Sequence, residues 1–254
     1  MKPLKISWLA GVYAFLYIPL ITLIILSFNR AKYASAWQGF TLKWYERLWQ
    51  NQQLLTAFFN SLTVAMVSSI MAVAIGTLGA FALSRYRFPG RRLFFTMVHS
   101  VMMSPDIVMG ISLLMLFVIL GIDPGFITLV LAHVTFCLPF VIVTVHARIK
   151  GFDPMVVDAA RDLGAGEFDI FYRIILPLIL PAVVAGWLLS FTLSLDDVII
   201  SFFVTGPGFD ILPLRIYSMV RLGVKPEVNA LCALLFLFTL VAVMAAHFLI
   251  KEKK

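Results

Sequence analysis

The sequence predicts an all-α integral membrane protein with six transmembrane helices and both termini in the cytoplasm. The first observation is composition: 61% of the 254 residues are apolar and only 13% are charged, whereas soluble domains are about half apolar and about a quarter charged. The second is a mean hydropathy of +0.99. The third is that the apolar residues gather in long runs. Together these observations require lipid as the solvent and exclude a single soluble domain.

Six stretches have the length of a membrane crossing, which takes roughly 20 mostly apolar residues. In chain order they are Ile6–Phe28, Leu54–Leu83, Leu93–Leu120, Phe126–Val145, Ile174–Val204 and Ala230–Ile250. The first stretch follows two lysines, as a signal peptide would, but it is too long for one and no cleavage site of small residues follows it. We therefore expect a retained helix. No repeat or linker divides the chain, which predicts one integral domain over residues 1–254.

The basic residues orient the predicted helices. With six crossings, the two termini and the loops 84–92 and 146–173 share one side of the membrane, and these segments hold most of the twenty Lys and Arg. The positive-inside rule places them in the cytoplasm. The same rule accounts for the formal charge of +7, so no nucleic-acid partner is expected.

The cytoplasmic loop 146–173 is predicted to contain a short amphipathic helix. Asp153 can cap its N-terminus, Pro154 suits its first position and Gly164 supplies a left-handed stop. Apolar residues recur between them on one helix face: Met155, Val156, Ala159, Ala160 and Leu163. A helix of about ten residues is not stable alone. Either the bilayer surface or a protein partner must therefore cover this face.

Part of this loop resembles the EAA loop of ABC importer permeases. The matching residues are Asp158, Ala159, Ala160, Gly164, Ile174, Leu176 and Pro177. The family usually begins the motif with Glu, and Asp158 is shorter by one methylene, so a contact made there would be altered. The resemblance implies a type I ABC importer permease fold. It also implies that Asp158, Ala159, Ala160 and Gly164 belong to a coupling helix that fits a cleft on an ATP-hydrolysing subunit.

Four further segments are similar to the spermidine/putrescine permeases of this family. They are SPDIVMGISLL from Ser104, FCLPFVIVTV from Phe136, GWLLSFTLSLDDVIISFFVTGP from Gly186 and ILPLRIYSMVRLGVKPEVNAL from Ile211. The resemblance implies a polyamine importer in which this chain works with a second permease subunit, an ATPase dimer and a periplasmic polyamine-binding protein. ATP and magnesium would be bound by the ATPase, because this chain has no Walker pattern. No cofactor is expected in the chain itself.

Three acidic residues, Asp106, Asp196 and Asp197, fall inside predicted membrane helices, in their outer halves. A carboxylate at the centre of the bilayer costs about 2.5–3.5 kcal/mol on the insertion scale, so we expect each to line a solute path or to make an interhelical hydrogen bond. Ser104-Pro105 predicts a helix break just before Asp106. Asp196 and Asp197 would point about 100° apart on a helix. We therefore expect one to face the path and the other to cap a break or contact the outer loop.

A polyamine path needs carboxylates for the ammonium groups and aromatic faces for the methylenes between them. Tyr13, Tyr17 and Trp187 can supply such faces, although aromatic residues at helix ends also serve as membrane anchors. No nucleophile–base pair or metal-ligand spacing is evident, so neither a catalytic site nor a metal site is predicted. The histidines, including His133, are expected to pack between helices, and the cysteines Cys137 and Cys232 indicate no disulfide.

Two alternative functions remain open. One is a permease for another small cationic solute. The other is a secondary carrier driven by an ion gradient, with the intramembrane acids as proton relays. The sequence shows no evident inverted repeat, and a capped cytoplasmic helix has no obvious use in such a carrier. Both features favour the ABC permease.

Overall fold

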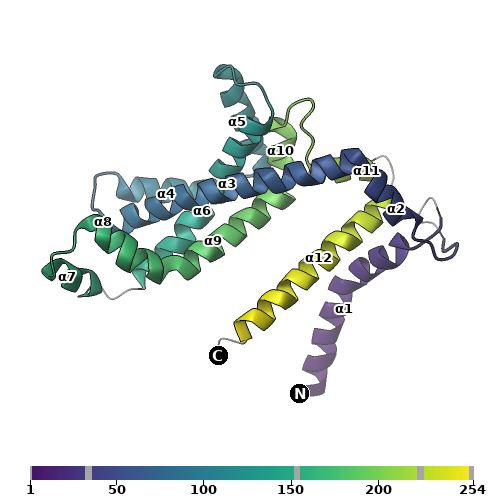
Figure 1. The fold of residues 1–254 in the computed structure, drawn as a ribbon, viewed down its shortest axis with the longest axis horizontal. Coiled ribbons are helices and arrows are strands. Elements are labelled where there is room, and N and C mark those ends of the chain that lie inside the picture. The colour runs from purple at the N-terminus through teal and green to yellow at the C-terminus, as the bar shows by residue number, and fades with distance from the viewer. Residues whose placement is uncertain (1, 32–35, 152–154, 222–225, 252–254) are drawn as a thin grey trace. The chain divides into compact units, whose positions relative to one another are not determined.

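The structure, a computed structural model, describes residues 2–31, 36–151, 155–221 and 226–251. These residues are almost entirely helical, which confirms the predicted all-α class; within them the one extended pairing is an isolated bridge between Asn29 and Phe40. The elements are α1 (Lys2–Ser27), α2 (Lys43–Gln50), α3 (Gln52–Arg85), α4 (Arg91–Met102), α5 (Asp106–Ile119), α6 (Phe126–Lys150), α7 (Met155–Asp162), α8 (Glu167–Asp169), the π-helical turn η1 (Ile170–Ile175), α9 (Leu176–Asp196), α10 (Ile199–Val204), α11 (Leu212–Arg221) and α12 (Pro226–Lys251) (Figure 1).

Four described helices are long and apolar enough to cross a membrane: Ser7–Ser27 of α1, all of α3, all of α6, and the continuous run from α8 to the end of α9. The pair α4 and α5 gives a fifth crossing if it is counted as one broken span. The helix α12 spans Pro226–Lys251, but the part of it described with its side chains, Pro226–Leu237, is shorter than a crossing and is not counted among the four. Six crossings and two cytoplasmic termini therefore stay predictions.

The stretch expected to cross the membrane over Leu93–Leu120 is divided into α4 and α5, which meet at an angle of 111°. The predicted break before Asp106 is confirmed: α4 ends at Met102 and α5 begins after Pro105, which has an extended backbone with ψ of 133°. Proline lacks the N–H that a continuous helix requires. The expected stretch Ile174–Val204 is broken as well, since α9 ends at Asp196 and α10 starts at Ile199.

The chain forms two compact units. The first comprises Met1–Thr56 and Arg215–Lys254, in which α12 packs against α1 and α2. Buried polar contacts hold the turn between α1 and α2. The indole Nε1 of Trp44 donates to the carbonyl of Asn29 at 2.7 Å, and the hydroxyls of Ser27 and Tyr45 lie 2.6 Å apart.

The second unit, Ala57–Leu214, contains α4 to α10 and most of α3. One apolar cluster joins α3, α6 and α9, and includes Leu83, Val141, Ile142 and Ile179. Another joins α5, α6 and α10, and includes Met109, Leu129 and Ile200. The helix α6 contributes to both clusters and is therefore the central element of this unit.

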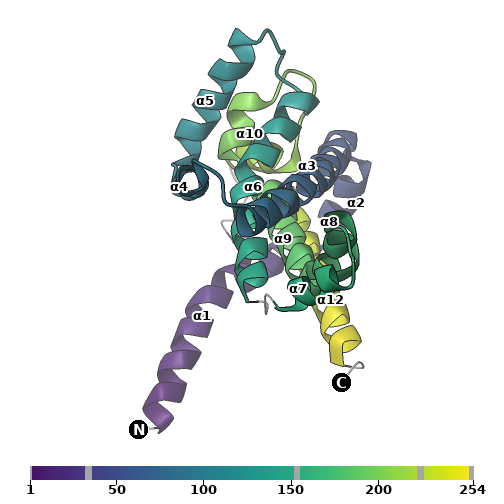
Figure 2. The same ribbon diagram turned by 90° about the vertical axis from the view of Figure 1, so that its left-hand side faces the viewer.

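The helices α5 and α10 lie side by side (Figure 2), and Gly110 of α5 lies close to the backbone of α10. A Cβ at Gly110 would lie 2.7 Å from Cδ2 of Phe203 and 3.3 Å from Cα of Ile200. Because the second neighbour is backbone, a side chain here would push the helices apart. The contact joins the segment after the Pro105 break to the segment after the Asp196 break.

The variant Gly110→Leu tests this packing. We expect it to lower the free energy of unfolding by about 1–3 kcal/mol through overpacking, measured as a lower thermal unfolding temperature of the purified protein in detergent. Gly11→Leu is the matched control, since Gly11 is also helical but a Cβ there meets nothing within 4 Å. Equal unfolding temperatures for the two variants would contradict the close approach.

Candidate functional site

The predicted short helix in the loop after α6 is present as α7. Its predicted start at Asp153 and Pro154 lies outside the described residues. Its predicted end is confirmed: Gly164 has φ of +84°, its N–H donates to the carbonyl of Arg161 at 2.8 Å, and the N–H of Ala165 donates to the carbonyl of Ala160 at 3.0 Å. These two bonds form a Schellman motif, which a left-handed glycine allows.

The apolar residues of α7 divide between two sides. Ala160 is only 7% exposed and packs, with Val157, into the cluster shared by α3, α6 and α9. Val156 and Leu163 remain exposed, at 46% and 89%, and Ala159 is exposed as well. Of the two adjacent alanines, Ala160 therefore attaches α7 to this chain and Ala159 is available to a partner.

A chain of ion pairs ties α7 to the end of α3. Glu167 at the start of α8 forms ion pairs with Arg85 and Arg161. Its Oε1 lies 3.1 Å from Nη2 of Arg85 and 2.5 Å from Nη2 of Arg161. Arg161 also lies 3.5 Å from Oδ1 of Asp158. Sequence reasoning missed Glu167, because no local spacing links it to Arg85 on another helix.

Asp106 is the first residue of α5, directly after the break at Pro105. Its side chain is exposed, and none of the ion pairs found among the described residues involves it. A negative charge in the first turn suits the partial positive charge of a helix N-terminus. The carboxylate of Asp106 is therefore placed at the break and is open to a cation.

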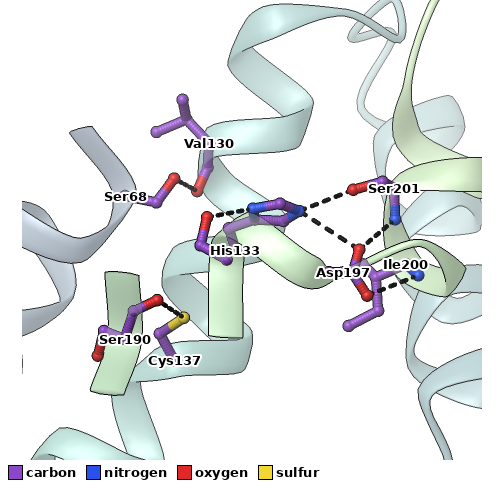
Figure 3. Close-up of polar contacts among 9 residues, drawn as sticks. Ser68, Val130, His133, Cys137, Ser190, Asp197, Ile200 and Ser201 are labelled. Atoms are coloured by element: carbon purple, nitrogen blue, oxygen red, sulfur yellow. Dashed lines mark hydrogen bonds and ion pairs between the residues drawn. The ribbon is translucent and has the colours of Figure 1, made fainter. Parts of the chain in front are cut away.

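Asp196 and Asp197 differ sharply although they are adjacent. Asp196 is exposed at the end of α9, whereas Asp197 is 8% exposed. The Asp197 carboxylate accepts hydrogen bonds from the backbone N–H groups of Ile200 at 3.3 Å and Ser201 at 2.8 Å (Figure 3). Asp197 thus caps the first turn of α10, and Asp196 is the acid left open.

His133 of α6 holds both sides of the break between α9 and α10 (Figure 3). It is fully buried; its Nδ1 lies 2.6 Å from the hydroxyl of Ser194, and its Nε2 lies 2.9 Å from the hydroxyl of Ser201. Nε2 also lies 3.5 Å from Oδ2 of Asp197. The expectation that this histidine packs between helices is confirmed, but no local pattern in the chain predicts its contact with Asp197.

Smaller polar contacts continue along α6. The thiol of Cys137 donates to the carbonyl of Ser190 on α9, and the hydroxyl of Ser68 on α3 donates to the carbonyl of Val130, both at 3.4 Å (Figure 3). Small polar residues that bond across helices are typical of membrane interfaces. Among the described residues, no group of three or more His, Cys, Asp or Glu side chains is placed to hold a metal ion.

The predicted aromatic faces belong to different units. Tyr13 and Tyr17 stack with ring centroids 6.2 Å apart, and both are exposed on α1 in the first unit. Trp187 lies half-buried on α9 in the second unit, beside Phe191. Its indole N–H has no hydrogen-bond partner among the described residues. Only Trp187 therefore shares a unit with the three acids.

Asp197→Ala tests the capping role. We expect a loss of about 2–4 kcal/mol in the free energy of unfolding, because two buried N–H groups and His133 lose their acceptor. Asp197→Asn should lose less, since its amide oxygen still accepts. The matched control Asp196→Ala should change the free energy of unfolding little, because the exposed carboxylate at the C-terminus of α9 gains no stabilisation from the helix dipole. Thermal unfolding in detergent measures all three, and similar losses at both positions would refute the assignment.

Comparison with known proteins identifies the family. The model of the family described as "Binding-protein-dependent transport system inner membrane component" matches residues 72–252. The chain is 56% identical over 250 residues to "Spermidine/putrescine transport system permease protein PotC" of Escherichia coli K12, covering 98% of this chain and 95% of that one. It is 42% identical over 241 residues to "Putrescine transport system permease protein PotI" of the same strain, covering 92% and 86%.

A solved structure supports the fold. A chain of the bacterial alginate ABC transporter, crystallised in complex with an alginate pentasaccharide-bound periplasmic protein, superposes with a TM-score of 0.76 at 17% identity, covering 96% of this chain and 91% of that one. The resemblance carried by the EAA-like pattern is confirmed. Homologues of this kind are transport subunits and not enzymes themselves. The chain belongs to the binding-protein-dependent transport system inner membrane components, as a multi-pass permease subunit of an ABC importer.

Proposed function

We propose that this permease carries spermidine and putrescine through the membrane. The observation that carries the proposal is the identity to PotC over nearly the whole of both chains. The similarity to PotI, whose name gives putrescine alone, supports the same class of substrate. A permease for another small cationic solute is the alternative, because exposed carboxylates in a membrane protein suit any cation.

The proposed assembly contains a second permease subunit, an ATPase dimer and a periplasmic polyamine-binding protein within the lipid membrane. An importer of related fold was crystallised with its periplasmic protein, which supports the last of these partners. ATP and magnesium would be bound by the ATPase, and no cofactor is assigned to this chain. Nucleic acid has no part in the proposal.

Coupling to ATP hydrolysis is assigned to α7. Its exposed side carries Asp158, Val156, Ala159 and Leu163, next to the stop at Gly164, and this side is available to the ATPase. Its other side is attached through Ala160. Movement of α7 would therefore displace the membrane helices to which it is attached, which is the step that opens and closes the path.

The path is assigned to the open acids. Asp106 and Asp196 each present an exposed carboxylate after or before a helix break, and each can pair with one ammonium group of a polyamine. Asp197 acts on the path by positioning α10. Trp187, and Tyr17 on α1, are assigned to the methylene segments, where an aromatic face also attracts a cation.

Uptake by the complete importer, reconstituted in vesicles with ATP and collapsed ion gradients, tests the proposed function. We expect labelled spermidine and putrescine to enter, with each competing against the other. Loss of uptake when the gradients collapse would instead indicate a secondary carrier. Uptake competed only by an unrelated organic cation would indicate the alternative substrate.

Substitution of the open acids tests the path. We expect Asp106→Asn and Asp196→Asn each to lower uptake about ten-fold or more, since a hydrogen bond to a charged group contributes about 1.5–3 kcal/mol. Asp123→Asn, which neutralises an exposed acid in the loop between α5 and α6, should leave uptake unchanged. Co-purification of the subunits controls for assembly. Normal uptake by the Asp106 and Asp196 variants would remove these residues from the path.

Glu167→Gln tests the link between α7 and α3. Two half-exposed ion pairs contribute about 0.2–1 kcal/mol each, so we expect about two- to thirty-fold fewer polyamines transported per ATP hydrolysed. Asp169→Asn is the control, because the ion pair that Asp169 makes among the described residues is with Arg173 on its own helical run, at 3.1 Å. A transport-to-ATP ratio that is equal in both variants would show that Glu167 does not contribute to coupling.

A further inference from the structure

A basic pocket of about 420 Å³ lies between the start of α4 and the end of α6, where α6 leads into the coupling loop. Its lining residues are Arg91, Arg92, Phe95, Thr96, His146 and Lys150. The two helices pack against each other within the second unit. The volume falls in the range of small-molecule sites, which is about 300–1,000 Å³.

Within the part of the chain that the structure describes, no acid faces the charge in the basic pocket. Arg91, Arg92 and Lys150 are basic, no acidic side chain lines the pocket, and none of the ion pairs among the described residues involves these three. Both arginines stand in the first turn of α4, which has no acidic residue and no side-chain cap. Cations at a helix N-terminus oppose its dipole. An anion would relieve both conflicts at once.

Two of the residues that line the basic pocket, Phe95 and His146, have aromatic rings that pack together. The rings of Phe95 and His146 have centroids 5.1 Å apart, and Nζ of Lys150 lies 6.0 Å from the centroid of Phe95. His146 is 5% exposed, and its Nδ1 lies 2.7 Å from the hydroxyl of Ser84. These contacts place the ammonium group of Lys150 over the ring of Phe95 in advance of any ligand.

The surface next to the basic pocket is apolar. Leu93, Phe94 and Met97 follow the arginines along α4 and are 60%, 43% and 55% exposed. A free phosphate ion makes no favourable contact with such a surface. The acyl chains of a phospholipid do, because burying apolar area against protein is favourable. The combination of cations and adjacent apolar side chains matches the two parts of a lipid.

We propose that the basic pocket binds the headgroup phosphate of an anionic phospholipid from the cytoplasmic leaflet. Basic pockets between membrane helices on this side are suited to anionic headgroups. Arg91, Arg92 and Lys150 hold the phosphate, and the acyl chains lie along the exposed side of α4. The bound lipid then joins α4 to the end of α6, beside the loop that carries α7.

Titration of the purified importer with phosphatidylglycerol or phosphatidylcholine, followed by native mass spectrometry, tests the proposal. We expect the first phosphatidylglycerol molecule to bind more tightly than the first phosphatidylcholine molecule. The variant Arg91→Gln/Lys150→Gln should weaken phosphatidylglycerol binding about 25-fold, at about five-fold for each charge near the surface. The control Arg87→Gln/Arg173→Gln removes the same charge from exposed positions outside the pocket and should bind like the unchanged protein. Phosphatidylcholine binding reports on folding in every variant.

Three results would overturn the proposal. Equal weakening in both double variants would indicate a general charge effect. Displacement of phosphatidylglycerol by inorganic phosphate, beyond that caused by chloride of equal ionic strength, would indicate a site for free phosphate. Loss of the ATPase subunits from the Arg91→Gln/Lys150→Gln importer, with phosphatidylglycerol binding unchanged, would indicate a protein interface.

Discussion

Every backbone N–H group at membrane depth needs an acceptor from the protein or from a water-filled cavity, because lipid offers none. The second unit contains two helix breaks that raise this problem. At the first, Pro105 has no N–H to satisfy. At the second, the carboxylate of Asp197 accepts from the N–H groups that open α10. The placement of α5, which begins at Asp106, and of α10 depends on these two solutions.

The break between α9 and α10 also depends on a side chain of α6. A buried carboxylate is costly unless it is paired and hydrogen-bonded, and His133 supplies the partner while also bonding Ser194 and Ser201 across the break. The break is thus held on both sides by one helix. Two identical neighbouring side chains therefore have different environments. The carboxylate of Asp197 stabilises the backbone at the start of α10, and that of Asp196 is left exposed and available.

Local signals in the sequence predicted much of this arrangement. Long apolar runs predicted the all-α class, which the described residues confirm. A proline before Asp106 and a glycine after α7 each act within a few residues, and the structure confirms the helix break and the helix end that they predicted. The contacts of Glu167 with Arg85 and of His133 with Asp197 join segments far apart in the chain. No periodicity or spacing encodes such a contact, because it depends on how α3, α6 and α9 pack. The same packing decided which of the adjacent aspartates became buried.

The attachment of α7 combines a strong contact with weak ones. Ion pairs as exposed as those of Glu167 contribute about 0.2–1 kcal/mol each, which is too little to transmit a large displacement. Fully burying an aliphatic side chain contributes about 1.5–3 kcal/mol, and Val157 and Ala160 pack into the cluster shared by α3, α6 and α9. In the proposed coupling, packing would therefore carry the force, while the two arginines on Glu167 would hold the angle at which α7 meets the ATPase. Such a joint would transmit motion and still allow α7 to adjust its orientation as the ATPase moves.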